Sequence, residues 1–106
     1  MAREKFQSLT EQMFYILLCL RNESCGADIA AQISAMTHNR VTVGPGTLYN
    51  VLDSFLQAEM IEETKVEGRK RSYLITRKGR MMLKEEYRRL MTLTADYRAC
   101  IGEEEL

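Results

Sequence analysis

The chain has few of the residues that mark disulfide-rich or fibrous proteins. It contains no Trp, one Pro, one His, three Cys and six Gly among 106 residues. So little Pro and Gly excludes collagen-like and other Pro-rich or Gly-rich fibrous classes. An odd number of cysteines without a Cys-x-x-Cys pair does not suit a disulfide framework and is typical of reduced thiols in a cytosol.

Long apolar runs are also missing. The longest, Met13–Leu20, has eight residues, whereas a helix that spans a membrane needs about 20. The charged start of the chain is not followed by the apolar stretch and cleavage site of a signal peptide. The sequence therefore predicts a cytoplasmic protein with no membrane partner.

The residues that are present suit one globular domain, and their charges are unevenly placed. Apolar residues make up 45% of the chain, and 15 bases balance 15 acids, so the composition suits a chain with a single core. Residues 41–64 hold four acids and no base, whereas residues 65–80 hold seven bases and one acid. An ordinary exposed turn would mix signs, so the second stretch indicates a basic patch that faces phosphate.

Two helices are predicted in the first third of the chain. Ser8 and Glu11 have the spacing of a capping box, in which each side chain binds a backbone N–H group at a helix start. The run Met13–Leu20 is apolar around its whole circumference, so such a helix must bury more than one face. We expect one face to meet the core and the other to meet a second subunit. Apolar residues at helical spacing between Ile29 and Met36 indicate the second helix.

A third helix is predicted after a short extended stretch, Val41–Val43, and opens on Gly44-Pro45-Gly46. Proline fits the first turn of a helix, where its missing N–H group is not needed. The inward stripe of this helix lies at positions i, i+3, i+4 and i+7: Leu48, Val51, Leu52 and Phe55. The opposite side is polar and carries no charge in its first turn.

A hairpin and a long helix are predicted to complete the chain. Residues 61–66 and 72–76 are rich in β-branched and aromatic residues, and Glu67–Arg71 between them would form a basic tip. A helix then runs from about Thr76 to about Cys100. It carries a short heptad seam with spacings of 4, 3, 4, 3 and 4: Leu83, Tyr87, Leu90, Thr94, Tyr97 and Ile101. So long a helix exceeds what a compact chain of this size needs, so we expect its end to pack on another chain.

The order of these elements is that of a winged helix-turn-helix. The predicted fold class is mainly α with a small β-hairpin: a winged helix-turn-helix DNA-binding domain in residues 1–78, then a C-terminal dimerisation helix and acidic tail in residues 79–106. In this geometry the third helix enters the DNA major groove and the hairpin contacts the adjacent backbone or minor groove. Thr47 can touch a thymine methyl group, and Asn50 can pair with adenine.

Several motifs resemble the PadR-like family of transcriptional regulators, from about Leu9 to Leu83. Leu9–Glu11 and Phe14–Leu18 look like the first helix of that family, and Cys25–Ile29 lies where its second helix starts. Val43–Leu52 contains Gly-Thr-Leu-Tyr, which is similar to its recognition-helix signature, and Gly68–Gly79 looks like its wing.

The resemblance implies a homodimeric repressor of the short subgroup, which has a single C-terminal helix and reads DNA with the start of the third helix. The DNA-binding residues are then predicted to be Pro45, Gly46, Thr47, Tyr49, Asn50, Lys65, Arg69, Lys70, Arg71 and Tyr73. Family dimers pair through the first and last helices, so the predicted interface comprises Met13, Leu17 and the six residues of the heptad seam. The DNA partner is a pseudo-palindromic operator.

A small hydrophobic or aromatic effector is a further candidate partner. Certain short members of the family bind flat aromatic drugs between tryptophans at the dimer interface, and this chain has no Trp. Phe14, Tyr15 and Tyr97 could line an interface cavity instead, although packing in the core accounts for such residues as well.

Other classes of function have less support in the residues. The single histidine, the adjacent rather than facing carboxylates and the lack of a phosphate-binding loop argue against an enzyme. Cys19, Cys25, His38 and Cys100 match no zinc pattern, so we predict no metal and no cofactor, although Cys25 is a candidate for an accessible thiol. A winged-helix protein-interaction module that does not bind DNA remains the main alternative, and the basic hairpin argues against it.

Overall fold

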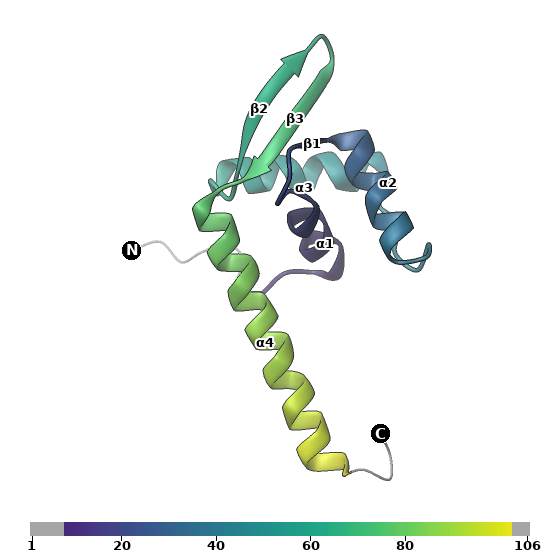
Figure 1. The fold of residues 1–106 in the computed structure, drawn as a ribbon, viewed down its shortest axis with the longest axis vertical. Coiled ribbons are helices and arrows are strands. Elements are labelled where there is room, and N and C mark those ends of the chain that lie inside the picture. The colour runs from purple at the N-terminus through teal and green to yellow at the C-terminus, as the bar shows by residue number, and fades with distance from the viewer. Residues whose placement is uncertain (1–7, 103–106) are drawn as a thin grey trace.

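The computed structural model describes residues 8–102, and Figure 1 shows the elements in the predicted order of three helices, a hairpin and a long helix. A short additional strand, β1, precedes the second helix. The elements are α1 (Glu11–Cys19), β1 (Ser24–Cys25), α2 (Gly26–Met36), α3 (Pro45–Gln57), β2 (Ile61–Glu67), β3 (Lys70–Ile75) and α4 (Arg77–Ile101). The predicted fold class is confirmed. The acidic residues Glu103–Glu105 lie outside the described residues.

The core lies between the first three helices and the base of the hairpin. Its largest fully buried side chains are Ile16, Leu17, Leu20, Ile29, Ile33, Leu52, Phe55 and Met60. On α3, the predicted inward stripe is confirmed, with Leu48, Leu52 and Phe55 buried and Val51 half-buried. Because these apolar positions occupy one side of α3, its opposite side is left at the surface.

The start of α1 differs from the prediction. Thr10, not Ser8, is the N-cap residue, and its side chain accepts a hydrogen bond from the N–H group of Met13 at 3.1 Å. Glu11 is the first residue of the helix, so the predicted capping box does not form. A capping threonine at this position binds one of the free N–H groups of the first turn without needing a glutamate three residues later.

The sheet has three antiparallel strands in the order β1-β3-β2. Ser24 pairs with Tyr73 and Cys25 pairs with Ser72. A strand of two residues is too short to show alternation, so no pattern in the sequence predicts β1. In β1, Cys25 is 7% exposed, so the expectation of an accessible thiol is wrong.

Val41–Val43, which the sequence predicts to be extended, is not part of a strand. Val41 and Val43 are buried in the core. Their β-branched side chains therefore pack in the core rather than form a sheet. A sequence of only three residues does not show which of these two roles applies.

The hairpin is tighter than predicted. The strands are joined by only Gly68 and Arg69, and Gly68 has a φ of +65°, a conformation that glycine adopts readily. The predicted five-residue tip is therefore wrong at both ends, since Glu67 and Lys70 pair with each other as the last residues of the ladder. The basic side chains consequently project from strands as well as from the turn.

The last helix, α4, leaves the body of the molecule. Thr76 caps its start by accepting a hydrogen bond from the N–H group of Gly79 at 3.1 Å. Gly79 lies against the backbone of Met60, whose carbonyl oxygen would be 2.1 Å from a Cβ atom at that position. With 25 residues the helix is about 37 Å long, and it projects away from the other elements (Figure 1). Every residue from 87 to 100 is exposed.

Candidate nucleic-acid interface

The exposed side of α3 presents polar groups without charge at its start. Pro45 occupies the first turn as predicted, and the N-cap residue, Gly44, has no side chain that could cap the helix. Gly46, Thr47 and Asn50 are exposed, and the first turn contains no acidic residue. Free N–H groups at a helix start and small polar side chains are the groups that contact phosphates and base edges.

Tyr49 on α3 depends on a glycine in another helix. Its side chain is 52% exposed and crosses the start of α2. A Cβ atom on Gly26 would lie 2.5 Å from the Tyr49 hydroxyl oxygen and 2.9 Å from the adjacent ring carbon. Only glycine therefore leaves room for the ring in this position, and Gly26 positions a residue predicted to touch DNA.

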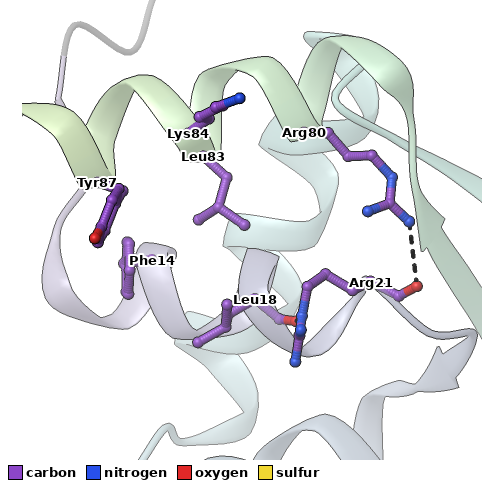
Figure 2. A pocket seen from close by; sticks show the side chains of 7 residues that line it. All are labelled: Phe14, Leu18, Arg21, Arg80, Leu83, Lys84 and Tyr87. Atoms are coloured by element: carbon purple, nitrogen blue, oxygen red, sulfur yellow. Dashed lines mark hydrogen bonds between the residues drawn. The ribbon is translucent and has the colours of Figure 1, made fainter.

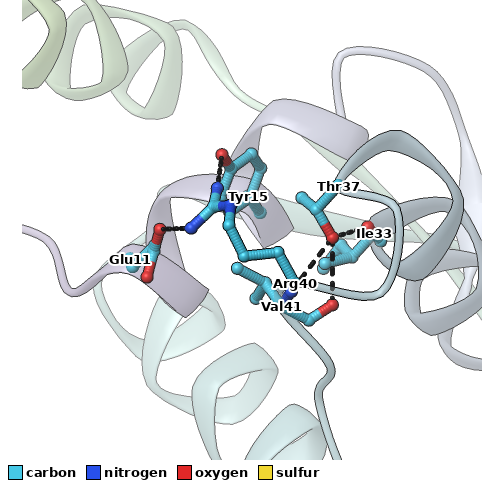
Figure 3. Close-up of polar contacts among 6 residues, drawn as sticks. All are labelled: Glu11, Tyr15, Ile33, Thr37, Arg40 and Val41. Atoms are coloured by element: carbon cyan, nitrogen blue, oxygen red, sulfur yellow. Dashed lines mark hydrogen bonds and ion pairs between the residues drawn. The ribbon is translucent and has the colours of Figure 1, made fainter.

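The loop before α3 is fastened to α1 (Figure 3). Arg40 forms an ion pair with Glu11 at 2.6 Å and donates a hydrogen bond to the Tyr15 hydroxyl at 2.9 Å. On the inner side, the Thr37 hydroxyl lies 2.8 Å from the Ile33 carbonyl oxygen and accepts from the Val41 N–H group at 3.1 Å. These bonds hold the loop that leads into α3 and so set where that helix begins.

The wing, defined here as β2, β3 and the turn between them, carries the predicted basic side chains. Lys65, Arg69 and Lys70 are exposed. Arg71 donates to Glu63 on the paired strand at 2.7 Å, and this contact raises the pKa of Arg71. An ion pair within the wing offsets the charge of Arg71, so the three other bases present the less compensated charge.

Tyr73 lies beneath this surface rather than on it. It is 4% exposed and, with Tyr49, Asp53, Glu63 and other residues, lines a groove of about 250 Å³ between α3 and the wing. Burial, and to a smaller extent the nearby Glu63 carboxylate, raises the pKa of its phenol. The groove places α3 and the wing side by side, and Tyr73 supports the wing from within the fold.

The residues predicted for a dimer interface fall into two groups. Leu17 is completely buried in the core of its own chain, and Met13 is half-buried against it. On α4, Leu83 and Ile101 are half-buried, and the four seam residues between them are exposed. Among these, Tyr87, Leu90 and Tyr97 have exposed fractions of 55%, 38% and 52%, so the seam on α4 is the accessible part of the predicted surface.

The three aromatic residues predicted for an effector site are not gathered in one groove. Phe14 and Tyr15 contact each other edge to face, with ring centroids 5.7 Å apart, and both line a groove of about 390 Å³ between α1 and α4. Tyr97 is not among the residues of that groove and lies about two turns beyond its nearest α4 member, Leu90. The hydroxyl of Tyr15 is already bonded to Arg40.

Sequence reasoning missed three residues that shape this surface: Gly26, Arg40 and Glu63. Each acts through a partner far away in the sequence or on the paired strand. The sequence places Gly26 near the start of the second helix, but it does not show that the Tyr49 ring lies against Gly26. Glu63 counted only as one of the acids of residues 41–64, and its pairing with Arg71 depends on the strand register.

In the residues described, 8–102, these features define a winged helix-turn-helix protein with a polar third helix beside a basic wing. The sequence model of the transcriptional regulator PadR-like family matches residues 16–85, which is more than half of the chain. The chain therefore belongs to the PadR-like family of transcriptional regulators and is a DNA-binding regulator of transcription. Family membership also confirms that it is not an enzyme.

Solved structures share the fold over most of their length. A transcriptional regulator from Clostridium thermocellum is 22% identical with a TM-score of 0.73, covering 87% of this chain and 90% of that one. A PadR-like transcriptional regulator from Bacillus cereus is 25% identical with a TM-score of 0.68, covering 86% of this chain and 92% of that one. A comparison with curated protein sequences finds no match.

Two further observations concern the described residues alone. None of their helices combines the length and the apolar character that crossing a bilayer requires. Between residues 8 and 102, no three His, Cys, Asp or Glu side chains are grouped so that they could hold a metal ion.

Proposed function

We propose that this regulator is a homodimeric repressor that recognises a pseudo-palindromic operator. The observation that carries the proposal is the juxtaposition of the acid-free start of α3 with the basic wing across one groove. The first surface supplies groups that read base edges, and the second supplies charge that meets phosphate.

Within this proposal the residues have distinct roles. Thr47, Tyr49 and Asn50 reach base edges in the major groove. Pro45 and Gly46 let the start of α3 approach the sugar-phosphate backbone of the DNA closely. Lys65, Arg69 and Lys70 bind phosphates, and Arg71 joins them when it leaves Glu63. Tyr73 acts from inside the fold, because its side chain is almost completely buried.

The proposed dimer rests on the exposed apolar side of α4. Five large apolar side chains there have exposed fractions between 38% and 55%: Tyr87, Leu90, Met91, Leu93 and Tyr97. An apolar surface of this kind on a charged helix favours association with a partner. Two recognition helices in such a dimer would meet successive major grooves about 34 Å apart, which explains the expected symmetry of the operator.

The proposal includes a small hydrophobic or aromatic effector. Such a molecule would enter the groove lined by Phe14 and Tyr15 and would act by favouring one spacing of the two recognition helices. Arg40, in the loop before α3, is hydrogen-bonded to Tyr15. A ligand in this groove that moves Tyr15 would therefore also move the start of the recognition helix.

Operator selection from a random duplex library tests the proposed function. We expect a selected site with two inverted half-sites about one helical turn apart. Tyr49→Ala and Asn50→Ala should each weaken binding to that site about tenfold or more, and should weaken binding to random duplex DNA much less. Equal losses on both DNAs, or selection without inverted half-sites, would contradict sequence reading by α3.

A further inference from the structure

Asp53 is the only charged residue of α3, and it lies on the outer side of that helix. At 3.6 residues per turn, Gly46, Asn50, Asp53 and Gln57 fall within about 60° of one another around the helix axis. This side is opposite the buried apolar stripe of α3, and all four residues are exposed. These four residues form the outer ridge of α3. The first two are predicted to touch DNA, and the ridge continues for two turns beyond Asn50.

The carboxylate of Asp53 is oriented by a neighbour on the same ridge. Gln57, one turn further along α3, donates a hydrogen bond from Nε2 to Oδ2 of Asp53 at 3.1 Å. Among the described residues, no other group forms a hydrogen bond with this carboxylate, and no Lys or Arg forms an ion pair with it. The bond to Gln57 therefore fixes the carboxylate and leaves its Oδ1 atom open to a partner outside the chain.

Two basic surfaces of the molecule leave Asp53 unpaired. One is the edge of a groove between α1 and α4, which is lined by three cations (Figure 2): Arg21, Arg80 and Lys84. The other is the wing, where Arg71 lines a groove together with Asp53 but is paired with Glu63. The side of α3 that is proposed to enter the major groove therefore presents an exposed negative charge that no described cation neutralises through an ion pair.

A carboxylate on the outer side of a recognition helix has a restricted choice of partners on DNA. It accepts hydrogen bonds but donates none, and the phosphates repel it. In the major groove, guanine presents two acceptors and thymine presents an acceptor and a methyl group, so neither base donates to a carboxylate. Cytosine presents an amino group alone, whereas adenine places an acceptor, N7, beside its amino group. Cytosine is therefore the base that suits a carboxylate best.

We propose that Asp53 is a specificity-determining residue that accepts a hydrogen bond from the N4 amino group of a cytosine, and that Gln57 is a positioning residue for its carboxylate. The inference rests on the proposed reading of DNA by α3 and adds one base of each half-site and the residue that reads it. Asp53 lies about 4.5 Å further along the helix axis than Asn50, and successive nucleotides of a strand are about 3.4 Å apart along the duplex. The cytosine is therefore one or two base pairs away from the base pair that Asn50 reads.

The base preference at each position of the operator tests this assignment. The operator selected by the unchanged, full-length chain is prepared with each of the four bases at every position of both half-sites, and the affinities are measured by fluorescence anisotropy. We expect one position, close to the one read by Asn50, at which cytosine gives an affinity about tenfold or more above that of the other three bases. Because the preference is a ratio of two affinities of the same protein, partial unfolding of a variant does not change it.

Two substitutions of Asp53 should change that preference in different ways. Asp53→Ala should reduce it to within about threefold, because the acceptor is lost. Asp53→Asn should transfer it from cytosine to adenine, because an amide can pair with both N6 and N7 of adenine.

Gln57→Ala tests the positioning residue. It should keep cytosine as the preferred base but reduce the preference about threefold, because the carboxylate loses the hydrogen bond that orients it. A purely structural role of Gln57 would leave this ratio unchanged. Glu85→Gln, which removes an exposed carboxylate of α4, is the matched control for net charge and should leave every ratio unchanged.

The other outcomes overturn either the inference or the function on which it rests. A complete lack of base preference in the unchanged chain would remove sequence reading by α3, and the inference with it. If the unchanged chain prefers an operator, but Asp53→Asn and Asp53→Ala raise the affinity for every duplex equally and change no preference, the carboxylate acts only by repelling phosphates. The inference is then wrong, whereas the proposed reading by Thr47, Tyr49 and Asn50 stands. A preference for adenine that depends on Asp53 in the unchanged chain would contradict the assignment of cytosine.

Discussion

At the scale of single residues, the predicted recognition surface depends on contacts made by residues outside the predicted DNA-binding set. Gly26 leaves room for Tyr49, Arg40 holds the loop before α3, and Glu63 pairs with Arg71. These contacts set the position and the net charge of the groups that face outward. Substitution of such residues should therefore change DNA binding, as substitution of the residues that touch bases should.

Gly26→Ala should weaken operator binding about tenfold. The added methyl group would lie 2.5 Å from the Tyr49 hydroxyl oxygen, and the exposed ring can move away at little cost in stability, so we expect the binding loss to exceed the loss in Tm. Fluorescence anisotropy on operator and random duplexes measures both affinities. Ala27→Ser, one residue further along the same helix, is the control. Unchanged operator affinity would show that the position of Tyr49 does not matter for binding.

A second residue-scale prediction concerns Glu86, a buried carboxylate on α4. It is 4% exposed and accepts hydrogen bonds from the Arg89 side chain. That bond, with a smaller contribution from the Leu9 N–H group, holds the pKa of Glu86 below its ordinary value although burial acts in the opposite direction. Glu86 therefore fastens the segment before α1 to α4.

Because the pKa is lowered on folding, the ionised Glu86 adds stability above the ordinary glutamate pKa of about 4.3. That stability is lost as the pH falls through the lower folded-state value. Glu86→Ala should reduce the free energy of unfolding by about 1–2 kcal/mol at neutral pH, and the difference from the unchanged chain should shrink below about pH 4. Urea unfolding at both pH values tests this, and a difference independent of pH would contradict the role of the charge.

At the scale of elements, those with strong local periodicity were predictable and those that depend on distant pairing were not. The stripe on α3 and the proline at its start follow from spacing within one segment. The strand β1 exists only because β3 lies beside it, fifty residues later. The polar side of α3 and the bases of the wing could be predicted, whereas the buried position of Tyr73 depends on how the wing folds over α3.

The wing also gives a prediction about charge. Glu63→Gln should release Arg71 from its ion pair and increase the affinity for random duplex DNA about threefold, with a salt dependence steeper by about one phosphate contact. Glu62→Gln removes a charge from the adjacent residue of β2, which forms no ion pair with a described residue, and should have a smaller effect. Equal gains from the two variants would mean that Glu63 acts only through net charge.

At the scale of the whole molecule, the zero net charge conceals a separation of charge between regions. The basic wing is offset in the total by acids before it and by the acids that follow α4. The extents of the molecule, 56 × 40 × 21 Å, reflect a helix that projects from the body with apolar side chains exposed along it. In our account, the wing meets DNA while the exposed apolar side of α4 meets a second copy.

The central claim is that the wing and α3 together form a DNA-binding surface, and the salt dependence of binding tests it most directly. The affinity for duplex DNA is measured against salt concentration for the unchanged chain, for Arg69→Ala/Lys70→Ala/Arg71→Ala, and for Arg88→Ala/Arg98→Ala on α4 as a control. We predict that the wing variant loses at least about tenfold in affinity at low salt and that its slope decreases by about two to three phosphate contacts, whereas the control keeps its slope. An unchanged affinity and slope for the wing variant would contradict the account and would favour a winged-helix module that binds protein instead.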